Sequence, residues 1–198
     1  MASMAIQHPT QIIKSQDTIV YVGALSGVTR PVITLASGGT LTRPSSGVPS
    51  DMYFLGGVTN ASVAINDGEQ EYYLLGNGGF ADSVKVTTRA QASITSYFQK
   101  DLDTGGLDET SYDEAMDVVL RGRSEKDLEL YVEIFKHNGG TTYDLTCFAA
   151  SVMNYSESYP ADNLVEVTFD LMSRGAVGVG RASISGDLIP GINGTPNS

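Results

Sequence analysis

The sequence predicts a mainly β fold, an antiparallel β-sandwich or small barrel with one flanking α-helix at about residues 111–121. Several stretches alternate apolar and polar residues with the period of two that a half-buried strand requires. Another stretch has the period of an amphipathic helix. Breaks rich in glycine and proline separate these stretches, and glycine accounts for 22 of the 198 residues.

The helix is predicted from five apolar residues at positions i, i+3, i+4, i+7 and i+8. Ser111-x-x-Glu114 has the form of a capping box, and Arg121 places a cation at the negative end of the helix dipole. We expect Gly122 to end the helix in a left-handed turn. An aspartate at Met116 or Leu120 is expected to stop folding. The apolar stripe consists of Tyr112, Ala115, Met116, Val119 and Leu120.

Three alternating strands are expected after the helix. The first, residues 128–136, has an apolar face and a second face with Glu129, Tyr131 and Glu133, which we expect to meet solvent or a partner. A hairpin turn at residues 137–140 leads into residues 143–155, where the alternation shifts near Phe148 and indicates a β-bulge. Residues 165–171 form the third strand, and residues 174–185 are expected to add a short edge strand.

The longest alternating stretch runs from residue 83 to residue 98. A strand of that length spans roughly 50 Å at about 3.3 Å per residue, well beyond the usual five or six residues. Such a strand suits a protein that builds a continuous sheet with its neighbours. Its polar face consists of Lys85, Thr87, Arg89, Gln91, Ser93 and Thr95.

In the N-terminal third the sequence predicts several short strands, at residues 18–25, 31–36, 51–55, 59–65 and 69–75. A loop or ragged hairpin rich in Gly, Ser and Pro is predicted at residues 37–50. Asn66-Asp67-Gly68 predicts a turn between the last two strands. We therefore divide the chain into an N-terminal arm, a single β-rich domain and an irregular tail. Their bounds are residues 1–16, 17–185 and 186–198.

Charge and composition exclude some functions. The chain has 12 basic and 23 acidic residues, a net charge of −11, which disfavours a protein that wraps nucleic acid with clustered Lys and Arg. No run of about 18 apolar residues suggests a membrane span. The single cysteine, Cys147, excludes an intramolecular disulfide and is expected to be a small buried residue.

Signals for chemistry are weak throughout. His8 and His137 lack partner patterns and are expected at the surface. The acidic stretch 101–109 begins like a calcium loop, but Gly105 and Tyr112 stand where ligands are needed. The sequence therefore predicts no catalytic residue, no metal site and no cofactor, and we do not expect an enzyme.

The order of these pieces resembles that of the major tail tube proteins of tailed bacteriophages. The resemblance covers about residues 70–175. It rests on the Leu75–Gly79 break before the long strand, the acidic loop and capped helix, the strand at 128–136, and the closing stretch 163–175.

The resemblance implies a structural protein of the virion tail, made in the host cytoplasm. Six copies close into a ring whose inner sheets form one barrel around a lumen, and stacked rings conduct DNA during genome ejection. The implied partners are further copies of the chain, sheath, terminator or baseplate proteins, and passing DNA, with no membrane. The polar face of residues 83–98 is then expected to line the lumen, and the net negative charge to let DNA slide past.

The arm 1–16 and the hairpin region 51–75 are expected to contact neighbouring subunits or rings, because both are apolar and weakly periodic. Two alternatives stay open at this point: the inner tube of a contractile injection system, and a monomeric sandwich module for binding or capsid decoration. The candidate contact residues are Asp51, Tyr53, Phe54, Tyr72, Tyr73 and Leu74.

Overall fold

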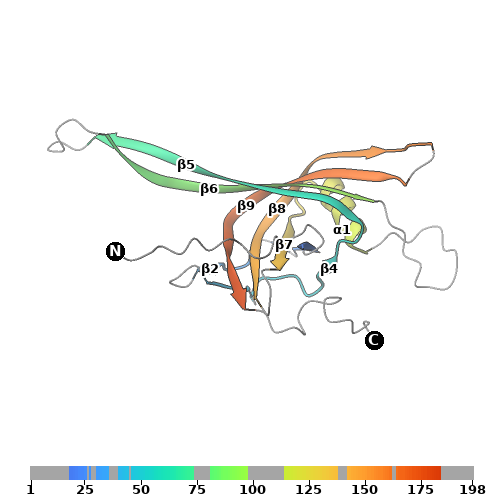
Figure 1. Cartoon of the computed structure of the whole chain (residues 1–198), viewed down its shortest axis with the longest axis horizontal. Coiled ribbons are helices and arrows are strands. Elements are labelled where there is room, and N and C mark those ends of the chain that lie inside the picture. Colours follow the sequence, from blue (N-terminus) through green and yellow to red (C-terminus); the bar gives the residue numbers. More distant parts are fainter. Residues whose placement is uncertain are drawn as a thin grey trace, which may run out of the picture.

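In the computed structural model the described strands form one seven-stranded antiparallel sheet, in the order β4-β1-β7-β8-β9-β6-β5, and a small sheet of β2 and β3 (Figure 1). The structure describes residues 18–25, 27, 30–35, 40–44, 46–73, 81–97, 114–137, 142–161 and 164–183. The elements are β1 Thr18–Ala24, β2 Thr34–Leu35, β3 Leu41–Thr42, β4 Tyr53–Phe54, β5 Val58–Tyr73, β6 Ala81–Tyr97, α1 Glu114–Ser124, β7 Leu130–His137, β8 Thr142–Ser158 and β9 Glu166–Ser183.

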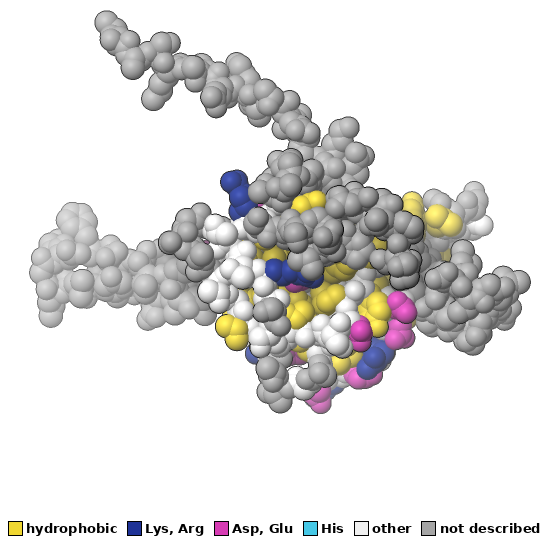
Figure 2. All heavy atoms as spheres, turned by 90° about the horizontal axis from the view of Figure 1, so that it is seen from below, with side chains coloured by type: hydrophobic (Ala, Val, Ile, Leu, Met, Phe, Trp, Pro, Cys, Tyr) yellow, Lys and Arg dark blue, Asp and Glu magenta, His cyan; other side chains and the backbone are white. Residues whose placement is uncertain are grey.

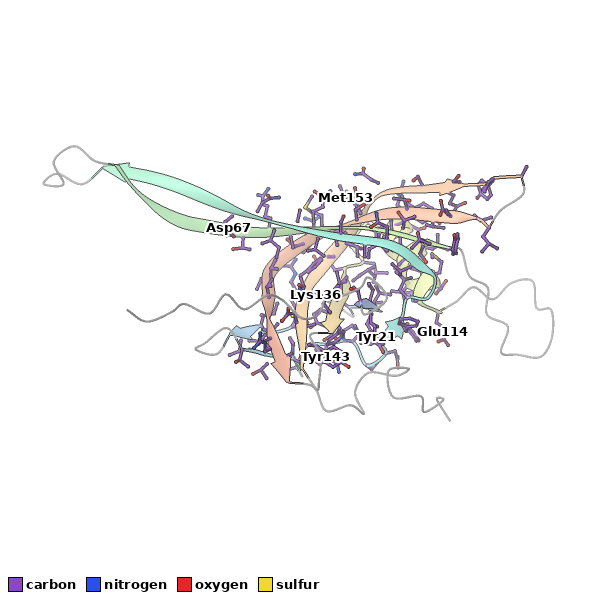
Figure 3. All side chains as sticks on the ribbon, in the orientation of Figure 1. Tyr21, Asp67, Glu114, Lys136, Tyr143 and Met153 are labelled. Carbon is purple, nitrogen blue, oxygen red and sulfur yellow. The ribbon has the colours of Figure 1, made fainter. Side chains whose placement is uncertain are left out.

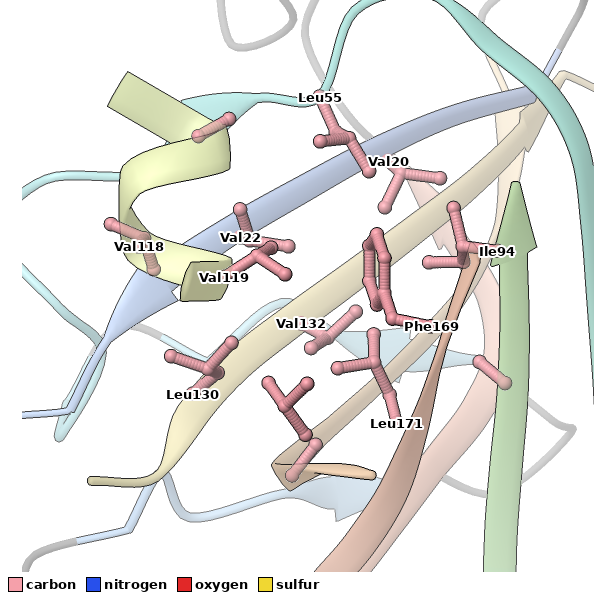
Figure 4. Packing of buried hydrophobic residues seen from close by; sticks show 14 of the residues in the cluster. Val20, Val22, Leu55, Ile94, Val118, Val119, Leu130, Val132, Phe169 and Leu171 are labelled. Atoms are coloured by element: carbon pink, nitrogen blue, oxygen red, sulfur yellow. The ribbon is translucent and has the colours of Figure 1, made fainter. Parts of the chain in front are cut away.

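The large sheet curls around a first hydrophobic core. Strands β1 and β6 lie far apart in the strand order, yet Val20 of β1 and Ile94 of β6 belong to the same buried cluster as Phe169 of β9. Figure 4 shows these three side chains pointing toward one another. The sheet can enclose a common core only by bending. One antiparallel sheet of seven strands with a flanking helix confirms the mainly β fold expected from the sequence.

Strands β8 and β9 bend from one side of this core to the other (Figure 1). Their pairing shifts register between Phe148 and Ala150, which confirms the expected bulge. Gly175 on β9 lies at the same place and has a φ of 89°, which favours glycine. Residues 174–183 do not form a separate short strand, because they continue β9 through Ser183. This half of β9 pairs with β8, whereas the pairing of β9 with β6 ends at Met172, so it has the edge position that the sequence suggested among the described ladders.

Helix α1 covers one end of the first core. Ala115, Met116 and Val119 are buried there as expected, while Leu120 is only partly buried. Ser111 and Tyr112 lie outside the described residues. The expected end at Gly122 is wrong, because the helix continues to Ser124. A Cβ atom at Gly122 would meet Val152 Cγ2 at 3.0 Å and Leu130 Cδ1 at 3.1 Å, so the glycine serves close packing instead of a turn.

A second core lies on the opposite face of β7, where the sequence suggested solvent or a partner. Tyr131, Glu133 and Phe135 are all 0% exposed, so that expectation is wrong. The strap, which we define as the described residues between 30 and 50, covers this face. Leu41 of the strap is buried with Tyr21 and Tyr143, and Cys147 is buried there as expected.

Glycine lets the strap approach β9 closely. A Cβ atom at Gly178 would lie 2.7 Å from Ile33 Cγ2 and 2.9 Å from Cys147 Sγ. The molecule is therefore layered. The layers are, in order, the strands β5, β6 and β9, the first core, the strands β1, β7 and β8, the second core, and the strap.

The β5–β6 hairpin extends beyond both cores (Figure 1). The expected turn at Asn66-Asp67-Gly68 is wrong, because these residues lie inside the single strand β5. Thr88 Oγ1 donates to Asp67 Oδ1 at 2.8 Å, and the register shifts between Gly68 and Glu69. Pairing with β6 along the whole strand overrides the local turn propensity and leaves a bulge in its place. The expected long strand at residues 83–98 is confirmed by β6.

Candidate assembly interface

One face of four neighbouring strands carries mostly small polar side chains, and we call it the polar face. It is opposite to the first core and combines β5, β6, the first half of β9 and the second half of β8. Figure 3 shows Met153 on this side of the sheet, away from Lys136 and Tyr143. The pairing registers place the following residues on it: Asn60, Ser62, Ala64, Asn66, Arg89, Gln91, Ser93, Thr95, Glu166, Thr168, Asp170, Met172, Ser151, Met153, Ser156 and Ser158.

The predicted polar face of β6 is part of this larger surface. Arg89 is exposed, and Gln91, Ser93 and Thr95 are half-buried beside their neighbours on β5 and β9. Lys85 and Thr87 belong to β6 by their backbone, but their side chains lie outside the described residues.

Charges on the described part of the polar face nearly balance. This face carries Arg89 and the two carboxylates Glu166 and Asp170, and Arg174 lies next to Ser151 of the same face. Asn154, at a bulge with a φ of 49°, donates through Nδ2 to Asp170 at 2.9 Å, and Arg174 Nε donates to Ser151 at 2.9 Å. The net charge of −11 therefore comes from other parts of the chain. Figure 2 shows acidic side chains (magenta) gathered at one end of the side it displays.

The polar face ends at two sheet edges. Strand β5 has 16 residues and is the last strand of the sheet, so no described strand pairs with its outer edge. On the other side, the pairing of β8 with β7 stops at Ala150, and the rest of β8 pairs only with β9 among the described strands. Long open edges template pairing with another chain unless they are covered.

The predicted contact residues fall into two separate groups. Asp51 and Phe54 are exposed near β4, and the Phe54 ring centroid lies 6.0 Å from that of Tyr21, whereas Tyr53 packs against the first core. Tyr72 and Tyr73 belong to the far end of β5, where their backbones pair with Asp82 and Ala81. Their side chains and Leu74 lie outside the described residues, so the structure places Asp51, Tyr53 and Phe54 near β4 and only the backbones of Tyr72 and Tyr73 at the far end of β5.

A buried ion pair in the second core is a feature that sequence reasoning missed. The Arg43 guanidinium donates to Glu133, with Nη2 at 2.6 Å from Oε2 and Nε at 3.0 Å from Oε1. Tyr131 Oη donates to the same carboxylate at 3.1 Å, and the guanidinium carbon lies 5.6 Å from the centre of the Phe135 ring. The hydrogen bond to Glu133 raises the pKa of Arg43. A carboxylate among buried strand residues requires such a partner.

A second ion pair holds the strap at its other end. Arg30 donates to Glu129 through Nη2 at 2.6 Å and Nε at 2.7 Å, in a more exposed setting. These hydrogen bonds lower the pKa of Glu129. Glu129 immediately precedes β7 and Glu133 lies on it. The alternation of these acidic residues with Tyr131, together with the arginines at positions 30 and 43, was the available sequence signal.

Buried tyrosines make the second core sensitive to alkali. Burial raises the pKa of Tyr21 to about 12 and also raises that of Tyr131. Because the unfolded value is about 10, the stabilising contribution is complete below about pH 10 and is lost as the pH rises toward the folded-state value. We expect the urea midpoint to fall between about pH 8 and about pH 11, and to fall less in Tyr131→Phe.

The matched control for this alkaline effect is Tyr159→Phe, because Tyr159 is 71% exposed. That variant is expected to keep the pH dependence of the parent chain. An identical pH dependence in Tyr131→Phe and Tyr159→Phe would contradict the assignment to buried phenols.

The described residues contain no group of three or more His, Cys, Asp or Glu side chains that could hold a metal ion. The acidic stretch 101–109 and His8 lie outside the described residues, as does the side chain of His137. In the part of the chain that the structure covers, no helix has the length and apolar character that a membrane crossing requires.

Comparison with solved structures finds chains with a similar fold. A chain of the SPP1 tail tube, known from solid-state NMR and cryo-EM, has a TM-score of 0.52 at 10% identity and covers 85% of this chain and 79% of that chain. A chain from the tail of an empty GTA particle, refined with C6 symmetry, has a TM-score of 0.49 at 11% identity, covering 84% and 97%. A chain of the anti-feeding prophage baseplate has a TM-score of 0.44 at 8% identity, covering 91% and 97%.

No protein-family model matches the sequence, and no curated protein matches it. Of the three structures, the SPP1 chain has the TM-score above 0.5, and the assignment of the fold is based on it. The resemblance read from the sequence is thereby confirmed at the level of the fold: this chain has the fold of a phage tail tube protein.

Proposed function

We propose that the protein is a structural subunit of a viral tail tube, in which six copies form a ring and stacked rings enclose a lumen for DNA during ejection. The observation that carries this proposal is the polar face, four strands wide, with an edge on each side that no described strand covers. A monomer gains nothing from such edges, which expose it to uncontrolled pairing. A closed ring covers all of them.

In the proposed ring the outer edge of β5 pairs with the free edge of β8 in the next copy. This is strand addition, in which backbone hydrogen bonds supply affinity and side chains supply specificity. The polar faces then merge into one continuous wall. The two cores and the strap lie on the outer side of that wall, because the layers follow one another away from the polar face.

The polar face suits the lining of a channel for a polyanion. Each fixed cation that neutralises a phosphate adds to retention of nucleic acid. On the described part of the face, Arg174 is hydrogen-bonded to Ser151, and the hydroxyls of Thr95 and Thr168 lie 3.1 Å apart. DNA is therefore expected to meet few fixed cations on this part of the face. Sheath, terminator or baseplate proteins would bind to other surfaces of the subunit.

Proline substitutions at two adjacent exposed positions of β5, Ala64 and Ile65, test the proposed edge. In an antiparallel strand the N–H groups of neighbouring residues point to alternate edges. One of Ala64→Pro and Ile65→Pro therefore removes a donor toward β6, and the other removes a donor on the outer edge. We expect the outer-edge variant to keep its stability and lose tube formation in sedimentation and electron microscopy.

Threonine at the same two positions is the control, because it keeps the backbone donor and suits a strand. Both threonine variants are expected to assemble. Tubes of normal yield from both proline variants would show that the outer edge of β5 is not an assembly edge.

A further inference from the structure

A hollow lies between the start of β1 and the start of β5, on the side of β5 away from the polar face. Its volume is about 600 Å³, and its apolar wall comes from Ala61, Val63, Ile134 and Val179. A second hollow of about 400 Å³ continues it toward Phe54 and shares Thr18 and Ala61. Together they form one groove along the open side of the curled sheet, which we call the β1–β5 groove.

Large apolar side chains are uncovered in and beside this groove. Val63 is 37% exposed and Val179 is 44% exposed, and both line the larger hollow. Ile65 is 40% exposed and follows Val63 on the same face of β5. Uncovered apolar side chains that adjoin one another mark a surface that another segment covers.

The rim of the groove carries charged side chains, but they do not converge as the polar groups of a small-ligand site do. Lys136 Nζ lies 3.2 Å from Asp144 Oδ2, and Arg181 is exposed beside them. Ligand pockets place a few polar groups so that they converge on the ligand. Here the lysine and the aspartate satisfy each other, so the apolar wall is the feature that selects an occupant.

We infer that Ile12 and Ile13 of the same chain occupy the β1–β5 groove. The N-terminal arm joins the domain at Thr18, and Thr18 itself lines both hollows. The six residue-to-residue steps from Ile12 to Thr18 span at most about 20 Å, enough to place the isoleucines along the groove.

The composition of the arm supports this occupant. Ile12 and Ile13 are adjacent large apolar residues, followed by the polar stretch Lys14–Asp17 that can turn the chain back. A tethered segment meets its site at an effective concentration in the millimolar range, which favours the arm of the same copy over a separate molecule. Residues 1–11 then remain for the contacts between subunits that the sequence suggests.

Disulfide trapping in dilute, unassembled protein tests the inference. Ile12→Cys and Ile13→Cys are each combined with Val63→Cys and oxidised with a glutathione redox buffer. A disulfide needs Cβ atoms about 3.8 Å apart. We expect at least one pair to form an intrachain link about tenfold faster than the control pairs, as a tethered contact implies.

The control pairs use Ser62→Cys in place of Val63→Cys. Ser62 is also exposed and adjacent in sequence, but its side chain lies on the polar face. Cys147 is 0% exposed, and burial raises the pKa of its thiol to about 11, so it does not compete. Val179→Cys provides a second groove position if the Val63 variants lose stability.

Two results would overturn the inference. Equal rates with Val63→Cys and Ser62→Cys, together with no link to Val179→Cys, would show that the arm does not occupy the groove. Interchain links at the groove, seen as dimers on denaturing gels, would show that the arm of a second copy occupies it. Because the experiment uses monomers, its outcome is independent of whether the protein forms tubes.

Discussion

Replacement of Arg43 by methionine is expected to lower the free energy of unfolding by about 3–5 kcal/mol. Glu133 is 0% exposed, and Arg43 is the cation that the structure places against it, at 2.6 Å. Methionine keeps an apolar stem against Phe135 but leaves the buried carboxylate, which accepts from the Tyr131 hydroxyl, without the guanidinium. A buried charge that loses its partner is far more costly than a solvated one.

The matched control is Arg30→Met. Glu129 immediately precedes the strand that carries Glu133, but its side chain is 24% exposed, and that of Arg30 is 46% exposed. Exposed ion pairs contribute about 0–1 kcal/mol, so this variant is expected to lose little. Urea unfolding of the two variants measures the difference. Equal losses would mean that burial of Glu133 does not govern the stability of the strap.

Replacement of Met116 by aspartate is expected to abolish folding. Met116 is 1% exposed and packs in the first core under α1. An isolated carboxylate there has no cation to pair with among the residues of the cluster, which are all hydrophobic. The cost of burying it is comparable with the whole stability of a domain, about 5–15 kcal/mol. Loss of near-ultraviolet circular dichroism and of soluble yield would record the effect.

Two variants separate charge from size and position. Met116→Leu conserves volume and is expected to cost less than about 1.5 kcal/mol. Leu120→Asp is expected to fold with reduced stability, because Leu120 is only partly buried and the carboxylate can reach water. This revises the expectation from sequence that both positions are equally sensitive. A folded Met116→Asp protein would contradict the placement of the helix on the core.

Elements whose side-chain pattern lies within a single strand could be predicted from the sequence. The alternation in β6 and the shift near Phe148 in β8 were both readable, because side-chain period is a property of a single strand. Asn66-Asp67-Gly68 misled because its turn propensity yields to a long ladder with a distant strand. The continuation of β9 was missed because Gly175 and Gly178 interrupt its pattern while fitting the bend and the strap.

The candidate interface was predictable only in part for the same reason. The outward residues of β6 could be read from their own alternation, but their neighbours on β5, β9 and β8 depend on pairing registers that no local pattern encodes. The buried face of β7 was read as solvated because Glu129 and Glu133 are acidic. Their partners, Arg30 and Arg43, lie 99 and 90 positions away in the sequence, respectively.

The most direct test of the account is a cryo-EM reconstruction of tubes assembled from the purified protein. We expect stacked six-membered rings with the polar face on the lumen wall, the outer edge of β5 paired with β8 of the next copy, and the strap on the outside. Tubes with the polar face outward, or a protein that stays monomeric even when mixed with the other proteins of its tail, would contradict the proposed function.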